Sequence, residues 1–284
     1  MERNGAMDFY KVTEWKKGMY RITSPEAVYM DLIVGEEKAL LFDTGWGLGD
    51  LSGTVRKITD KPLYVVNSHG HVDHVNGNFQ FTEDIYIHPK DLELCQAHSS
   101  APMRQFVLMG VEKMGALPES FDKENYLAEH ENHYVPVEEG HVFDLGGKKL
   151  EVIELPGHTV GSIGLFDREE KVLLVADAIA AATLLNGPEA APLSVYRQTI
   201  QKAKDLDPKV ILQGHGDGNG VEKEMLDVYY EVTENVEWEK AIPYKDGEKE
   251  NPDVRVVCRR GQTLDNREDK DFVCIVFTRD KLDA

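Results

Sequence analysis

Cysteine is scarce in this sequence of 284 residues, which contains three, Cys95, Cys258 and Cys274, and no Cys-x-x-Cys pair. An odd number without a paired motif argues against a disulfide scaffold and against an all-thiolate metal site. Free thiols of this kind are typical of proteins in a reducing compartment. We therefore expect a cytoplasmic protein whose cysteines act as ordinary packing residues.

Long apolar runs are missing as well. No segment approaches the roughly 18 to 20 apolar residues that a membrane-spanning helix requires. The first five residues lead into a mixed polar stretch that lacks the apolar core of a signal peptide. We expect neither export nor association with a membrane.

Basic residues are few relative to acidic ones, with 32 Lys and Arg against 51 Asp and Glu and a formal net charge of -19. This excess of negative charge makes nucleic acids and bulky polyanions poor partners. The hydrophobic fraction of 41% and the charged fraction of 29% indicate a globular chain, and its length allows a sizeable core.

What the sequence does contain is an alternation of short β-rich runs with segments of helix-forming residues. Strands are predicted over 20–23, 28–34, 39–42, 63–67, 85–88, 142–145, 150–155, 162–166, 172–176, 210–212, 254–258 and 272–277. Helices are predicted over 51–58, 193–205 and 221–240, with two or three more within 89–131, and a polar linker over 246–253. This order of elements predicts a layered α/β architecture.

The segment His69-Gly70-His71-Val72-Asp73-His74 places four metal-competent side chains within six residues, directly after an apolar strand. In an extended chain, side chains two residues apart point the same way, so His69, His71 and Asp73 can converge on one ion. His74 then points elsewhere and suits a second ion. Such a density of ligand types predicts a metal site.

Three later segments repeat this context. His158 follows the predicted strand 150–155, Asp177 ends the strand 172–176, and His215 follows the strand 210–212 between two glycines. Loops at the ends of strands are where a rigid sheet can hold a binding site. We predict that these side chains join those of the first motif.

Taken together, these motifs resemble those of the metallo-β-lactamase-fold hydrolases, ligand for ligand and in the same order. Asp43, in Leu41-Phe42-Asp43-Thr44-Gly45, is similar to the acidic residue of that family's first motif. The resemblance covers roughly residues 28–220 and implies a four-layer αββα sandwich with a two-metal site at one edge of the paired sheets. Residues 1–245 would form the catalytic domain, with a helical insert at about 89–131. Residues 246–284 would form a C-terminal strand pair packed on it.

The resemblance also implies how the side chains divide between two divalent ions. The ligands of the first ion would be His69, His71 and His158. The ligands of the second ion would be Asp73, His74 and His215. Asp177 would bridge both ions, and Asp43 would orient a ligand histidine and raise its basicity.

All of these donors are nitrogen or oxygen, a set that allows zinc, manganese or iron, and zinc is the metal we expect. Two such ions about 3.5 to 4 Å apart lower the pKa of a shared water from 15.7 toward about 7 and so generate hydroxide. The resemblance implies attack of this hydroxide on an ester, thioester or lactone carbonyl of a small molecule. Asp73 would handle a proton as the catalytic residue.

Two other activities of the same fold remain open, a phosphodiesterase and an iron-dependent oxidoreductase. The segment 73–78 resembles the hydroxyacylglutathione hydrolase and lactonase branches, which favours carbonyl hydrolysis. Persulfide dioxygenases use three protein ligands, so the complete second set disfavours them. Flavodiiron enzymes place a glutamate where His71 stands.

Weaker signals concern the substrate and the assembly. Trp46, just after Asp43, and Tyr196 are candidates for contact with substrate. The methionine-bearing insert 89–131 lies where this family covers its substrate, so we consider an apolar lid there. His130 and His133 fit a solvated helix end better than a metal site. The C-terminal strand pair would complete a sheet edge or form a homodimer contact.

Overall fold

The computed structural model describes residues 9–114, 117–118, 121–246 and 249–282. The chain divides into two compact units. Unit 1 comprises Met1–Ile87, Leu92–Pro136 and Asp144–Lys148, and unit 2 comprises His88–Asp91, Val137–Phe143 and Lys149–Ala284. This division does not test the domain boundary expected at residue 245, which stays a prediction.

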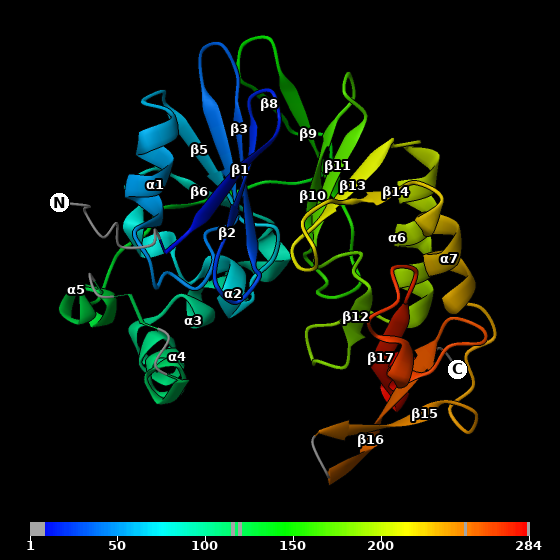
Figure 1. Ribbon diagram of the computed structural model, residues 1–284. Coiled ribbons are helices and arrows are strands. Elements are labelled where there is room, and N and C mark those ends of the chain that lie inside the picture. Colours follow the sequence, from blue (N-terminus) through cyan, green and yellow to red (C-terminus); the bar gives the residue numbers. More distant parts are fainter. Residues whose placement is uncertain (1–8, 115–116, 119–120, 247–248, 283–284) are drawn as a thin grey trace, which may run out of the picture. The chain divides into compact units, whose positions relative to one another are not determined.

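Unit 1 is built on one seven-stranded sheet whose strands follow the order of the sequence (Figure 1). Pairing is antiparallel from the first strand to the fourth and parallel from the fourth to the seventh. The strands are β1 (Lys11–Lys16), β2 (Met19–Thr23), β3 (Tyr29–Val34), β4 (Ala39–Phe42), β5 (Leu63–Val66), β6 (Ile85–Ile87) and β7 (Tyr134–Pro136). Because β4 and β5 are parallel, their carboxyl ends meet at the same edge of the sheet.

The parallel step from β4 to β5 is carried by helix α1 (Leu51–Ile58), since parallel neighbours need a crossover connection. Its N-cap Asp50 accepts a hydrogen bond from the backbone N–H of Gly53 at 2.8 Å. Leu51 and Val55, four residues apart on one helix face, are buried in the core of the sheet.

The insert predicted to be helical contains α3 (Leu92–His98), α4 (Ala101–Met114) and α5 (Lys123–Leu127). The short helical turn η2 (Pro89–Asp91) opens this insert, and two further turns precede it, α2 (Val72–Val75) and η1 (Asn78–Gln80). Within the described residues, no helix is both long and apolar enough to cross a membrane.

Unit 2 contains two sheets. The first has the order β14-β13-β11-β10-β9-β8 and the second the order β12-β17-β16-β15. The strands of the first sheet are β8 (Val142–Asp144), β9 (Lys149–Glu154), β10 (Ile163–Asp167), β11 (Val172–Ala176), β13 (Val210–Gln213) and β14 (Val221–Glu222). Those of the second are β12 (Ala182–Leu185), β15 (Ile242–Asp246), β16 (Lys249–Cys258) and β17 (Cys274–Thr278).

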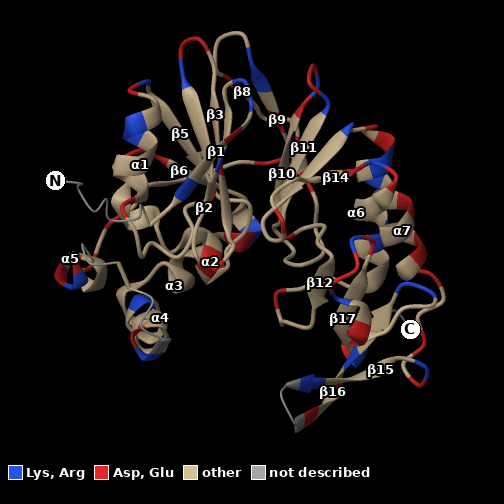
Figure 2. Ribbon diagram, viewed as in Figure 1, with Lys and Arg blue, Asp and Glu red and all other residues tan. Residues whose placement is uncertain are grey.

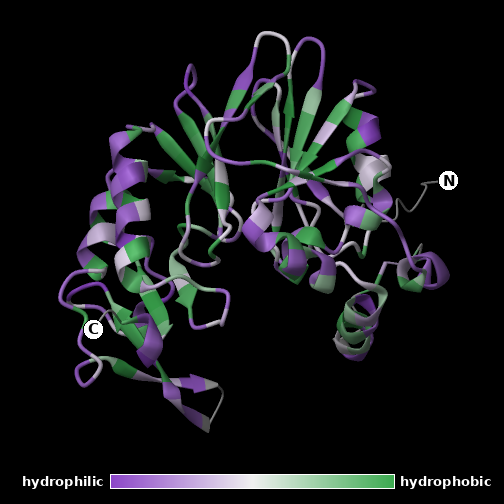
Figure 3. Ribbon diagram, turned by 180° about the vertical axis from the view of Figure 1, so that it is seen from behind, coloured by the Kyte–Doolittle hydropathy of each residue, from purple (hydrophilic) through white to green (hydrophobic). Residues whose placement is uncertain are grey.

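Helices α6 (Leu193–Asp205) and α7 (Met225–Val232) lie side by side in unit 2 (Figure 1). Their apolar faces share a core with β10, β11 and β17, and the strands carry much of the hydrophobic colour in Figure 3. Their outer faces carry charges of both signs (Figure 2), with Lys204 on α6 paired to Asp227 on α7 at 2.7 Å.

Two predicted elements were wrong. The helix predicted over 221–240 is a short strand, β14, followed by α7, because residues 221 and 222 pair with the edge of β13 and Asn235 enters the left-handed region after α7. The linker predicted over 246–253 belongs to the β15–β16 hairpin, apart from residues 247 and 248, which lie outside the described residues. Charged side chains suit an edge hairpin of this kind.

The sequence analysis also missed β1, β7, β12 and β15. Strand β12 pairs in parallel with β17, about ninety residues later in the sequence, and such a partner leaves no local signal. The C-terminal strands β16 and β17 pair with each other, as predicted. The pairing is antiparallel, and the two strands complete a sheet with β12 and β15. The homodimer contact stays a prediction.

Candidate metal centre

The metal-competent side chains of unit 1 lie at the shared edge where β4 and β5 end. The backbone N–H of Asp43 donates to the carbonyl of Val66 at 2.8 Å, which joins the two strand ends. Asp43 has a φ of 69°, in the left-handed region that aspartate tolerates better than most residues. Strained backbone of this kind clusters at functional sites.

The Asp43 carboxylate is buried and accepts three hydrogen bonds. The backbone N–H of Ser68 donates to Oδ1 at 2.7 Å, and the Ser68 hydroxyl donates to Oδ2 at 2.7 Å. The ring of His74 donates from Nδ1 to Oδ2 at 2.8 Å. Asp43 therefore orients a histidine of the first motif, and Ser68, which the sequence analysis did not single out, is its second partner.

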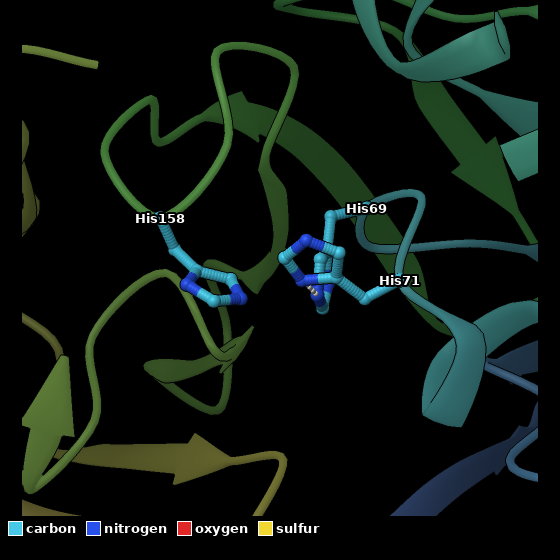
Figure 4. A group of neighbouring side chains, drawn as sticks. All are labelled: His69, His71 and His158. Atoms are coloured by element: carbon cyan, nitrogen blue, oxygen red, sulfur yellow. Dashed lines mark hydrogen bonds between the residues drawn. The ribbon is translucent and has the colours of Figure 1, made fainter. Parts of the chain in front are cut away.

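His69 is held through the same network. Its Nδ1 lies 2.9 Å from the Ser68 hydroxyl, which itself donates to Asp43, so Nδ1 carries the proton and the hydroxyl accepts it. Its Nε2 lies 3.1 Å from Nδ1 of His71 (Figure 4). Two nitrogen ligands at about 2.05 Å from a tetrahedral ion would be about 3.3 Å apart. The observed spacing fits this arrangement.

The extended geometry predicted for the first motif was wrong beyond His71. His71 is the N-cap residue of the helical turn α2, and Asp73 and His74 lie on that turn. The turn closes because the backbone N–H groups of His74 and Val75 both donate to the carbonyl of His71. Asp73 and His74 nevertheless lie close together, with 3.6 Å between Oδ2 and Nε2.

Unit 2 brings the three later side chains together. Oδ2 of Asp177 lies 3.9 Å from Nε2 of His158 and 3.4 Å from Nε2 of His215. Asp177 directly follows β11, whose last residue, Ala176, has a φ of 45°. The carbonyl of Ala176 accepts from the N–H of Gly214, which places His215 beside it. One carboxylate thus stands between two imidazoles.

The hydrogen bonds of three histidines define which ring nitrogen is available. Nδ1 of His158 donates to the carbonyl of Leu184 at 2.9 Å, as Nδ1 of His69 and of His74 donate to their own acceptors. In a neutral ring the proton then sits on Nδ1, and Nε2 offers its lone pair. Ligand histidines in metalloproteins are oriented in this way. The donor set of both units therefore fits divalent metal ions.

The sequence matches a known superfamily. The model of the metallo-beta-lactamase superfamily matches residues 24–215. The chain belongs to this superfamily. Its layered α/β fold is the one predicted from the sequence, and it resembles the metallo-beta-lactamase from Pontibacter korlensis with a TM-score of 0.56 and 18% identity, over 80% of this chain and 100% of that one.

Two curated relatives in the superfamily are named as thioester-cleaving enzymes. The chain is 26% identical over 208 residues to the acyl-coenzyme A thioesterase MBLAC2 of Bos taurus, covering 68% of this chain and 74% of that protein. It is 25% identical over 194 residues to the hydroxyacylglutathione hydrolase GloC of Haemophilus influenzae, covering 64% and 81%.

The two residues considered for substrate contact differ in position. Tyr196 is completely buried in the core of unit 2, with its hydroxyl 2.8 Å from that of Thr183, and burial raises the pKa of its phenol. A Cβ on Gly157 would lie 2.5 Å from its ring, so the glycine allows this packing. We correct the expectation for Tyr196, which packs the core. Trp46 is partly buried and lines a cavity of unit 1.

A further cluster in unit 2 has ligand atoms within 4.8 Å of one another, on His88, Glu138 and Glu154. Its hydrogen bonds do not fit a metal. Nδ1 of His88 accepts the backbone N–H of Lys90 at 3.2 Å, so in a neutral ring Nε2 carries the proton and donates it to Glu154 at 3.1 Å. The lone pair that a metal needs on Nε2 is then absent.

His130 and His133 are bound to local partners in unit 1. His130 lies after α5, with Nε2 2.8 Å from the carbonyl of Asn125. The exposed His133 pairs with Asp84 at 2.8 Å. The exposed position of His133 agrees with the prediction, whereas His130 is half-buried and its ring lies 4.9 Å from that of Phe79.

Proposed function

We propose that this chain is a two-metal hydrolase that cleaves the thioester bond of a small-molecule substrate. The metal-competent side chains would hold a pair of divalent ions, with the division of ligands expected from the family. The oriented Nε2 atoms of His69, His74 and His158 are the observation that carries this proposal. The names of the relatives support a thioester over the other carbonyl substrates.

When bound, the two ions would polarise the substrate carbonyl and lower the pKa of water. Zinc is the metal we propose, because nitrogen and oxygen donors without thiolate suit it and the ligand set is complete. The free cysteines agree with a cytoplasmic location. The net charge of -19 agrees with a small substrate rather than a polyanionic polymer.

Asp73 is the carboxylate that we assign to proton transfer. Asp43 is buried, and its two oxygens already accept three hydrogen bonds from Ser68 and His74. The side chain of Asp73 is 20% exposed, and its Oδ2 lies 3.6 Å from His74. The side chain of Asp73 is therefore partly accessible, as a general base that exchanges a proton with substrate or solvent must be.

The ligand assignment is tested by His71→Ala and Asp177→Ala, with the exposed His133→Ala as the matched control. Each ligand variant should lose hydrolysis and bind less metal, because it lacks a donor to one or both ions. The control should keep both properties. Full activity with normal metal content in either ligand variant would overturn the assignment.

The reaction class is tested by metal analysis with a panel of ester, thioester, lactone and phosphodiester substrates. We expect two divalent ions per chain and the highest kcat/KM on thioesters. Stoichiometric iron with oxygen consumption would instead identify an oxidoreductase. Preference for the phosphodiester would identify the other alternative of this fold.

A further inference from the structure

Unit 1 contains an apolar cavity of about 510 Å³ that is lined in part by Val72 of the first motif. This volume lies within the range of small-molecule binding pockets. Of its eleven lining residues, seven belong to α4, and Trp46, Leu48 and Val72 are among the others. Two lining residues are charged, the half-buried Glu26 and the exposed Lys113.

The α4 side of the cavity is a regular helical stripe. Met103, Phe106, Val107 and Gly110 follow the i, i+3, i+4, i+7 spacing that places residues on one face of a helix. Phe106 is 68% exposed and the neighbouring Met109 is 48% exposed. Large apolar side chains that line a cavity and remain in water are typical of a surface that binds an apolar ligand.

This wall is held in place by a buried arginine. The Arg104 guanidinium donates to the backbone carbonyls of Ser99, Tyr126 and Ala128, and its carbon lies 5.1 Å from the centre of the Phe79 ring. These contacts tie the first half of α4 to the segment that includes α5. The cavity is therefore preformed, which lowers the entropic cost of binding.

The cavity is also linked to the first metal-competent motif, because one of its lining residues belongs to that motif. Val72 lines it and stands between His71 and Asp73, and Trp46 follows Asp43 by three residues. The indole N–H of Trp46 is buried and has no hydrogen-bond partner among the described residues. It is available to an oxygen of a bound molecule, since buried donors are usually paired.

We propose that this cavity binds the acyl chain of the substrate, and that the enzyme is selective for long unbranched acyl groups. The inference rests on the proposed thioester hydrolysis, whose substrate class it narrows. A flexible methylene chain suits a wall that combines methionine and aromatic side chains with the stem of Lys113. Val72 would place the carbonyl end of such a chain next to the ligands of unit 1.

Gly110 provides a sharp test, because a Cβ at this position would meet no atom within 4 Å. Gly110→Phe therefore has room for its Cβ and adds a large side chain to the cavity wall, and phenylalanine has a higher helix propensity than glycine. The matched control is Gln105→Phe, an exposed α4 position outside the lining. Urea unfolding of all three proteins establishes that they fold equally well.

The probes are the S-butyl and S-dodecyl thioethers of N-acetylcysteamine, which are neutral and cannot be hydrolysed. Their affinities for the metal-loaded protein are measured by calorimetry. Each methylene buried in the cavity should tighten binding about fourfold, so the dodecyl probe should bind at least about 100-fold more tightly than the butyl probe. Gly110→Phe should reduce this preference at least about tenfold, and Gln105→Phe should leave it unchanged.

Hydrolysis of the butanoyl and dodecanoyl thioesters of N-acetylcysteamine completes the test. A preference for the dodecyl probe that Gly110→Phe reduces at least about tenfold supports the acyl site. This holds even if neither thioester is cleaved, in which case only the proposed reaction fails. Cleavage of both thioesters with equal kcat/KM and no probe preference would overturn the acyl site and leave the reaction intact. An equal effect of the two phenylalanine variants would also overturn it.

Discussion

The hydrogen bonds of Asp43 allow a quantitative prediction of how a substitution at this position changes metal affinity. In Asp43→Asn, the remaining oxygen can still accept the backbone N–H of Ser68, but the new amide group faces His74 in place of Oδ2. To accept a hydrogen bond from the amide, the imidazole must move its proton from Nδ1 to Nε2. The nitrogen that we assign to the second metal would then be blocked.

The expected loss of metal affinity is that of removing the hydrogen-bond acceptor of a ligand histidine. Loss of a group that orients a ligand histidine typically weakens metal affinity by about 10- to 100-fold, or about 1.4 to 2.7 kcal/mol. His69 should be affected less, because the Ser68 hydroxyl that joins it to Asp43 can rotate and accept from both neighbours. We therefore expect one of two zinc ions to be lost at lower chelator concentration.

The Asp43→Ala variant separates the effect of the His74 tautomer from the effect of the backbone conformation at position 43. Alanine leaves His74 free to keep its proton on Nδ1, but it fits the φ of 69° less well than asparagine does, by about 1 to 2 kcal/mol. The alanine variant should thus be the less stable in urea without metal, while the asparagine variant should bind zinc more weakly.

Zinc affinity is measured by competition with a chromophoric chelator. The matched control is Asp167→Asn, a buried aspartate of unit 2 whose Oδ1 accepts two backbone N–H groups that an amide oxygen can also accept. Its zinc affinity should equal that of the wild type. A zinc affinity of Asp43→Asn within about twofold of the wild type would refute the reasoning.

Two further predictions concern stability. Arg104→Met keeps the apolar stem but leaves three backbone carbonyls without their donor, so urea unfolding should show a loss of about 2 to 4 kcal/mol, and an unchanged midpoint would contradict the anchoring of α4. Hydrogen bonds from Lys171 and Lys223 lower the pKa of Asp207 from 3.8 to about 2, so its stabilising effect is present above about pH 4 and lost as the pH falls toward 2. Asp207→Asn, which suits the local φ of 49°, should therefore be less stable than the wild type at pH 6, with a smaller difference at pH 3; an equal difference at both pH values in urea unfolding would contradict this assignment.

Much of the site was predictable because its residues follow strands in a fixed order. Asp43, His69 and Asp177 each come directly after, or within three residues of, an apolar run that the sequence marks clearly. Apolar runs bounded by glycine and polar residues are strong local signals. Ser68 carried no such signal, since one serine in a loop has many ordinary roles and its contact with Asp43 spans 25 residues.

Other errors came from contacts that hydrophobic periodicity does not reveal, one of them local and two between segments distant in the sequence. The turn α2 replaced the predicted extended segment because local backbone hydrogen bonds closed at His71. Tyr196 became a core residue because Gly157 left room for its ring, and β12 formed because β17 was available to pair with it. Each outcome depends on a partner that periodicity within a short window cannot identify.

The sequence by itself determined the family, the layered α/β class, and the identity and order of the metal-competent side chains, because ligand chemistry and strand periodicity are local properties. Tertiary structure alone decided which nitrogen of each histidine faces its acceptor, since that depends on Asp43, Ser68 and Leu184. It also decided where the apolar insert leaves a cavity. Burial and hydrogen bonding between distant segments determine both the orientation of these rings and the position of the cavity. No single segment of the sequence contains enough information to predict either.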